Sequence, residues 1–86
     1  MITVHLPASL AAEAGADTLT ITDVVRTVGD LVDLLAVRLP SFRALFDDAL
    51  INVAVNDDML LHGVRDRPLA DGDIVELIPT ISGGSA

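Results

Sequence analysis

The sequence predicts a two-layer α+β domain in which one main helix packs across a mixed sheet. Short segments alternate apolar and polar residues as strands do, one longer segment has the apolar spacing of a helix, and turn-forming residues separate them. At 86 residues, with no Pro/Gly/Ser-rich stretch in the middle, the chain is expected to form one domain. It has no cysteine, so its stability must come from packing rather than from disulfides.

Two strands are expected near the N-terminus, over residues 2–6 and 18–22, because both segments alternate with period two. Pro7 ends the first strand. The Ala-rich connection over residues 8–17, with a helical turn expected at 9–14, is short enough for the two strands to form a hairpin. The predicted inward-facing residues are Ile2, Val4, Leu6, Leu19 and Ile21.

The main helix is predicted to begin after Thr27, which can cap it, and Asp30 follows at the third position, as in a capping box. Pro40 ends this helix, and residues 41–49 are expected to add a short second one. The apolar stripe of the main helix consists of Leu31, Leu34, Leu35 and residues 37–39. The residues expected to cover one end of the core are Phe42, Leu45 and Phe46.

The third and fourth strands are predicted over residues 50–55 and 74–78, preceded or followed by the turn-forming segments 56–58 and 70–73. A right-handed crossover through the helix is expected to place the third strand parallel to the first, or near it. The order strand, strand, helix, strand, loop, strand is typical of the β-grasp arrangement.

The charge of the chain excludes several classes of partner. Thirteen acidic residues and five arginines give a net charge of −8, which repels nucleic acids and anionic membranes and attracts basic protein surfaces. Phe42 and Phe46 are the only aromatic residues, so there is no base-stacking platform. Arg65 and Arg67 are interpreted as part of a solvated loop. The first residues do not resemble a signal peptide and no segment has the length of a membrane span, so a cytoplasmic location is expected.

No catalytic or metal-binding constellation is found in the sequence. His5 and His62 lack a third ligand at a suitable spacing, and the acidic pairs at 57–58 and 71–73 are ordinary turn residues rather than a calcium site. No general acid, base or nucleophile is placed for catalysis. The chain is therefore predicted not to be an enzyme on its own.

The chain is divided into a domain over residues 1–78 and a flexible tail over residues 79–86. Pro79 has no amide hydrogen and is expected to end the sheet ladder. Gly83 and Gly84 have no side chains, so the tail is thin enough to enter a narrow site, and from Pro79 to Gly84 it can reach roughly 20 Å. The alternative interpretation is a frayed polar terminus.

Four short segments follow one another along the chain: Thr-Val-Gly-Asp-Leu at 27–31, Val-Ala-Val-Asn at 53–56, Pro-Leu-Ala-Asp-Gly-Asp at 68–73, and Ile-Pro-Thr-Ile-Ser-Gly-Gly at 78–84. In this order they resemble the sulfur-carrier branch of the ubiquitin-like β-grasp family, most closely the small subunit of molybdopterin synthase (MoaD/ThiS-like). The resemblance runs from Met1 to Gly84.

The resemblance implies a chemistry for the C-terminal glycine. A ubiquitin-activating-type adenylyltransferase would use ATP to convert the Gly84 carboxyl to an acyl-adenylate, and a persulfide would then give a thiocarboxylate. Activation is needed because a carboxylate is a poor electrophile. The chain would act as a co-substrate that binds no cofactor itself, and a sulfur-accepting enzyme, such as the molybdopterin synthase large subunit, would be its second partner.

The chain departs from the family pattern after Gly84, where Ser85 and Ala86 follow. Either a protease removes these two residues, or they are foreign to the natural chain, or the protein does not carry sulfur. The intact segments upstream favour the first two explanations.

A docking face is predicted from strand alternation and from the resemblance. Ile78 faces outward on the last strand and Ala54 on the third. Pro7, Met59 and Ile78 match positions where the synthase small subunit presents an apolar patch to its partners, and Gly83 would bind in the partner's channel. The alternative is that these residues are apolar side chains scattered over the surface.

Several functions remain open. A sulfur carrier for molybdopterin synthase is the leading hypothesis, and a carrier that donates sulfur to cysteine, thiamine or another metabolite is the nearest alternative. A ubiquitin-like modifier attached to lysines through Gly84, or an interaction module with an inert tail, belongs to another class.

Overall fold

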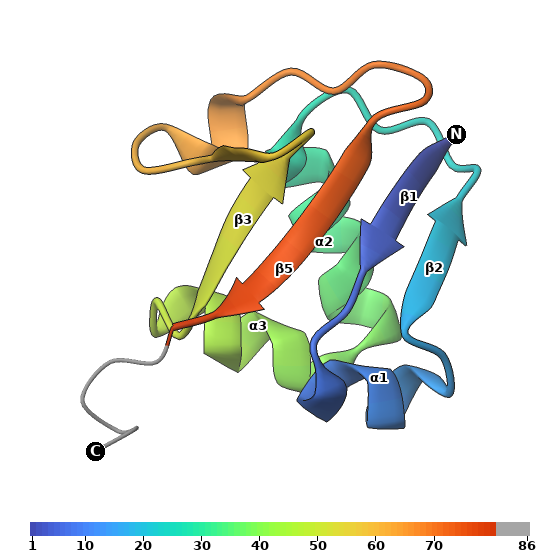
Figure 1. Ribbon diagram of the computed structural model, residues 1–86, viewed down its shortest axis with the longest axis vertical. Coiled ribbons are helices and arrows are strands. Elements are labelled where there is room, and N and C mark those ends of the chain that lie inside the picture. The colour runs from blue at the N-terminus through green and yellow to red at the C-terminus, as the bar shows by residue number, and fades with distance from the viewer. Residues whose placement is uncertain (81–86) are drawn as a thin grey trace.

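The computed structural model describes residues 1–80, which form a five-stranded mixed sheet covered on one face by helices (Figure 1). In chain order the elements are β1 (Ile2–His5), α1 (Ala8–Ala14), β2 (Thr18–Ile21), α2 (Val28–Arg38), α3 (Pro40–Asp47), β3 (Ile51–Val55), β4 (Asp58–Met59), the 3-10 helix η1 (Val64–Asp66) and β5 (Ile74–Pro79). The strand order is β2-β1-β5-β3-β4, so the strand latest in the sequence lies in the middle of the sheet. The predicted α+β class with a mixed sheet is confirmed.

The direction of the third strand was predicted wrongly. β1 and β5 are parallel, whereas β3 is antiparallel to β5, so β3 is antiparallel to β1. The crossover through α2 starts from β2 rather than β1. Because β2 is antiparallel to β1, a crossover that makes β3 parallel to β2 necessarily makes it antiparallel to β1.

Helix α2 begins as its sequence predicts. The Thr27 hydroxyl accepts a hydrogen bond from the Asp30 backbone N–H at 3.2 Å, and the Asp30 carboxylate accepts one from the Arg26 N–H at 3.0 Å. The first bond satisfies a backbone donor that the helix start would otherwise leave unpaired, and the second ties the residue before the cap to the first turn. α2 ends at Arg38, and Pro40 begins α3, where its missing N–H is harmless.

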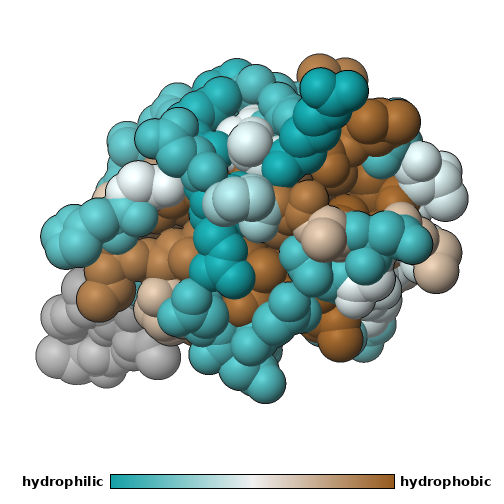
Figure 2. All heavy atoms as spheres, turned by 90° about the horizontal axis from the view of Figure 1, so that it is seen from above, coloured by the Kyte–Doolittle hydropathy of each residue, from teal (hydrophilic) through white to brown (hydrophobic). Residues whose placement is uncertain are grey.

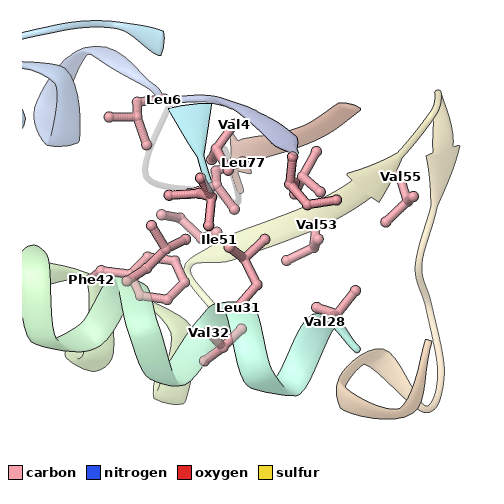
Figure 3. Packing of buried hydrophobic residues seen from close by; sticks show 14 of the residues in the cluster. Val4, Leu6, Val28, Leu31, Val32, Phe42, Ile51, Val53, Val55 and Leu77 are labelled. Carbon is pink, nitrogen blue, oxygen red and sulfur yellow. The ribbon is translucent and has the colours of Figure 1, made fainter. Parts of the chain in front are cut away.

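The core lies between the covered face of the sheet and the helices (Figure 3). All inward positions predicted on β1 are buried, and so is Ile21 of β2, whereas Leu19 is partly buried. Phe42 of α3 is fully buried, while Leu45 and Phe46 pack partly exposed against the core, which confirms that they cover one end of it. The other face of the sheet carries no helix and faces the reader in Figure 1.

Two short elements of the β3–β5 connection were not predicted. A two-residue turn at Asn56 and Asp57, with φ of 50° and 70°, returns the chain as β4 beside β3. Farther on, η1 packs against α2, and backbone bonds from Val28 to Arg67 and from Leu69 to Arg26 hold the connection there. None of the helices within residues 1–80 is long and apolar enough to cross a membrane.

Candidate functional site

The last described residues are held against β3 as far as Thr80. Pro79 pairs with Ile51 within the sheet, and the Thr80 N–H donates to the Leu50 carbonyl at 2.9 Å. The prediction that Pro79 ends the sheet ladder is therefore wrong, and the strand runs one residue beyond the predicted boundary at Ile78.

The alternation of hydrogen bonds explains why a proline is tolerated there. Thr80 donates to the carbonyl of Leu50, and Ile74 accepts from Asn56, so the even-numbered residues of β5 bond β3. An N–H at position 79 would point the other way, toward β1, and β1 has already ended at His5. The missing donor of Pro79 thus removes no bond from the sheet.

The chain leaves the sheet beside the start of β3, at the lower left of Figure 1. The predicted reactive Gly84, the partner-binding Gly83, and Ser85 and Ala86 lie outside the described residues. Their assignment as reactive, binding or removable residues stays a prediction.

The structure places two of the three predicted docking residues on the uncovered face of the sheet. Ile78 lies opposite Asn52, and Met59 lies opposite Ala54, so both share this face. Met59 is 40% exposed and Ile78 is half-buried. They are not adjacent. β3 lies between their strands, which are therefore two spacings of about 4.8 Å apart, and their partners on β3, Ala54 and Asn52, are two residues apart.

Pro7 lies beyond the sheet, whereas Ala54 lies on the uncovered face as strand alternation predicts. Pro7 is half-buried and forms the N-cap of α1, where its carbonyl accepts hydrogen bonds from Leu10 and Ala11. Its position beyond β1 thus has a structural role. Ala54 does lie on the uncovered face, opposite Glu76 and Met59, yet it is only 4% exposed because longer side chains surround it.

Glu76 occupies the centre of this face and had no role in the sequence-based prediction. Its strand neighbours are His5 on β1 and Ala54 on β3. The row continues to Thr18 on β2 and Met59 on β4. The alternation of β5 showed that Glu76 points outward, but only the strand order shows that it lies on the central strand.

Arg65 and Arg67 do more than occupy a solvated loop. Arg65 Nη2 lies 3.1 Å from both carboxylate oxygens of Asp33 on α2, and Arg67 Nη1 lies 2.7 Å from Asp58 at β4. Both pairs are partly exposed, so each stabilises the fold by about 1 kcal/mol at most. Their contribution is to tie the β4–β5 connection to α2 and β4.

Asp73 and Asn56 form a polar contact at the start of β5. A hydrogen bond from the Ala70 N–H, followed by one from the Asn56 side chain, lowers the pKa of Asp73 below its usual value. Asn56 Oδ1 also accepts a bond from the Ile74 N–H at 2.9 Å. This contact joins the β3–β4 turn to the central strand.

Within residues 1–80 no polar or charged side chain is buried, no pocket is present, and no three potential metal ligands lie together. The end of the molecule seen in Figure 2 carries hydrophilic side chains together with connected stretches of apolar ones.

Comparison with known protein families identifies one match. The model of the ThiS family matches residues 4–84. No curated protein sequence matches the chain.

Three solved structures illustrate the structural likeness. The small archaeal modifier protein SAMP1 of Haloferax volcanii is 33% identical with a TM-score of 0.71, covering 96% of this chain and 98% of its own. A chain of the BexX/CysO complex of Amycolatopsis orientalis is 25% identical with a TM-score of 0.75, covering 98% and 100%. A Pyrococcus furiosus protein assigned as subunit 1 of a molybdopterin converting factor is 28% identical with a TM-score of 0.68, covering 91% and 94%.

The family match begins within β1, includes β5, which lies beside β1 in the sheet, and ends at the second glycine of the tail. Together with the ubiquitin-like β-grasp fold, it shows that this chain belongs to the ThiS family of small sulfur carriers.

Proposed function

We propose that Gly84 is adenylated by a ubiquitin-activating-type enzyme with ATP and then converted to a thiocarboxylate, which donates sulfur as the small subunit of molybdopterin synthase. The observation that carries the proposal is the ThiS family match, which extends to Gly84 itself. The likeness to the Pyrococcus furiosus converting-factor subunit supports the choice of acceptor. Proteins of this family are generally carriers, and catalysis resides in their partners.

The proposed conversion of the Gly84 carboxylate to a thiocarboxylate takes three steps and uses no catalytic group of this chain. The Gly84 carboxylate attacks the α-phosphorus of ATP and pyrophosphate leaves, giving a mixed anhydride. A persulfide sulfur from a sulfurtransferase then attacks the carbonyl and AMP leaves. A thiol reduces the remaining acyl disulfide to the thiocarboxylate. Glycine leaves the carbonyl open to attack, and AMP is a far better leaving group than hydroxide.

The attachment of β5 limits how far the tail can reach. Because pairing holds the chain through Thr80, four residues, 81–84, span the distance to the reacting carbonyl. Fully extended they cover about 14 Å at most. The enzyme that acts on Gly84 must therefore come within this distance of the end of β5. Ser85 and Ala86 would have to be removed first, and we assign that step to a protease.

Intact-mass analysis tests the proposal. Chains ending at Gly84 and at Ala86 are incubated with the adenylyltransferase of the same genome, ATP and a persulfide donor. We expect only the chain ending at Gly84 to gain the mass of one oxygen replaced by sulfur. Equal conversion of both chains, or of neither, contradicts the role of Gly84.

A second candidate function is a protein modifier joined to lysines through Gly84. The 33% identity to a small archaeal modifier protein favours it. The same reaction, supplied with a lysine-containing protein, distinguishes the two because a modifier gives covalent adducts. A carrier for cysteine, thiamine or another metabolite would form the thiocarboxylate but fail to transfer its sulfur to the pterin precursor.

A further inference from the structure

We propose that the free edge of β2 binds an extended segment of a partner protein, which extends the five-stranded sheet by one strand and carries a basic side chain at each end of the pairing. The segment would run antiparallel to Thr18–Ile21, with its two basic side chains opposite Asp17 and Asp23. The inference goes beyond the proposed function, because it needs neither Gly84 nor any chemistry of the tail.

The backbone of β2 offers hydrogen-bonding groups on its outer side. β2 is the end strand of the sheet, at the right of Figure 1, and β1 is its one neighbour. The Leu6 N–H donates to the Asp17 carbonyl at 2.8 Å, so the odd-numbered residues of this segment bond β1. The N–H and C=O groups of Thr18 and Thr20 therefore point away from β1, where an added strand can pair with them.

The edge at β2 lacks the features that keep sheet edges from pairing. Proteins protect such edges with charged residues, prolines, bulges or very short strands. The opposite edge, β4, has two residues, and Arg67 Nη1 lies 2.7 Å from the carboxylate of Asp58 on that strand. β2 consists of Thr-Leu-Thr-Ile, which are uncharged, include no proline and pair with β1 without a bulge. Of the two edges, β2 is thus the one open to another strand.

The side chains of β2 set the pattern expected of the added strand. On the covered face Ile21 is fully buried, whereas Leu19 is only partly buried. An apolar side chain placed beside Leu19 would remove more of its surface from water. On the other face Thr18 and Thr20 are exposed, and short polar side chains suit that side. The expected segment therefore alternates apolar and polar residues.

Charge favours a different protein over a second copy of this chain. Asp17 and Asp23 flank β2 and are exposed, and among residues 1–80 Asp17 forms no ion pair, while Asp23 pairs with Arg38 at 3.1 Å. If two copies paired antiparallel about Thr20, Asp17 of each would lie opposite Asp23 of the other, and like charges in that position are unfavourable. Each copy also has a net charge of −8. Lys or Arg at both ends of a partner segment would instead attract both carboxylates.

This edge is separate from the place where the tail leaves. Thr20 shares a row with Thr3 and Ile74, so two strand spacings of about 4.8 Å separate it from β5. Thr80 lies six residues farther along the chain than Ile74, which is about 20 Å of extended strand. The tail beyond Thr80 reaches about 14 Å at most as far as Gly84. The tail cannot reach the added strand, so the two binding events use different parts of the chain.

A synthetic peptide tests the inference on the full chain. The probe is Lys-Thr-Val-Thr-Val-Thr-Lys, acetylated and amidated, which matches residues 17–23 in length and places its central threonine opposite Thr20. Its Kd is measured by titration, followed by the backbone amide NMR signals of the chain, and we expect the largest shifts at residues 17–23. N-methylation of the central threonine, or Glu in place of both lysines, should weaken binding about tenfold. N-methylation of a valine, whose N–H would point away from β2, should change Kd less than about twofold.

Two variants at one position provide the matched control in the chain itself. Thr20→Pro removes an N–H that does not bond β1, so the sheet should tolerate it, and Thr20→Ala keeps this N–H. We expect about tenfold weaker peptide binding for Thr20→Pro and a change within about threefold for Thr20→Ala, with circular dichroism melting showing that both variants fold. Asp17→Lys should bring the Kd values of the Lys-ended and Glu-ended peptides closer together.

The peptide results stand even if a variant fails to fold. Absence of binding by the Lys-ended peptide, shifts centred outside residues 17–23, or equal Kd values for the two N-methylated peptides would overturn the inference. A dimer of the unmodified chain that Thr20→Pro abolishes would also overturn it, because a second copy would then occupy the edge. None of these outcomes bears on the proposed function, which is tested by the mass of the tail.

Discussion

The side chain of Asn56 is expected to stabilise the sheet, because it joins the β3–β4 turn to the start of β5. It adopts φ of 50°, its Oδ1 accepts from Ile74 at 2.9 Å, and its Nδ2 donates to Asp73 at 3.0 Å. Asn56→Ala removes both hydrogen bonds. It also places in the left-handed region an alanine, which lacks the polar side chain that makes this region tolerable for asparagine. The backbone bond from Asn56 to the Ile74 carbonyl should remain.

The size of the effect follows from these three terms. The two side-chain bonds are exposed, so water replaces part of each, and together they contribute about 1 kcal/mol. The left-handed backbone costs an alanine about 1 kcal/mol. We therefore expect unfolding to become easier by about 2 kcal/mol, which lowers Tm by roughly 8–16 °C in a domain of this size.

Urea and thermal unfolding followed by far-UV circular dichroism measure this change, since the chain has no Trp or Tyr to report by fluorescence. Asp57→Gly is the matched control. It alters the adjacent turn residue, whose φ of 70° suits glycine and whose side chain makes none of these bonds. We expect it to change stability by less than about 0.5 kcal/mol. If Asn56→Ala is as stable as the unmodified chain, or if Asp57→Gly is equally damaging, the reasoning is refuted.

Three further outcomes are expected. Met59→Asp and Ile78→Asp should weaken binding to the adenylyltransferase, because an outward charge is costly only when an interface desolvates it. Met59→Asp should leave Tm nearly unchanged, and a large loss of Tm would place Met59 in the core. Raising the salt concentration should slow association of the chain with the adenylyltransferase more than it speeds dissociation, since charge steering is screened beyond about 8 Å at physiological ionic strength. An association rate that does not depend on salt would mean that the acidity serves solubility. Because the pKa of Asp73 is lowered in the folded protein, its carboxylate stabilises the fold above the unfolded pKa of about 3.9, and this stabilisation is lost as the pH falls through the lower folded pKa. Asp73→Asn should therefore flatten the acid side of a plot of stability against pH. An unchanged plot would contradict this.

Much of the candidate site was predictable because it is local. The Gly-Gly tail and the outward alternation of β5 are visible in the residues themselves. Glu76 could be placed on the outer face in the same way, but its importance depends on its neighbours. Those neighbours come from β1 and β3, which are far from it in the sequence. The place of Pro7 at the start of α1 could not be predicted from strand alternation, because it depends on hydrogen bonds from Leu10 and Ala11 to the Pro7 carbonyl. Its role in docking stays a prediction.

The sequence by itself determined four of the five strands (β1, β2, β3 and β5), the capped start of α2, the inward residues of β1 and the α+β class. Period-two spacing, helical spacing and capping all act over a few residues. The tertiary structure decided the direction of β3, the pairing of Pro79 and Thr80, the ion pairs of Arg65 and Arg67 and the central place of Glu76. Each of these depends on which strands become neighbours. That choice is made by burying the apolar faces of distant segments together, and a local pattern does not record it.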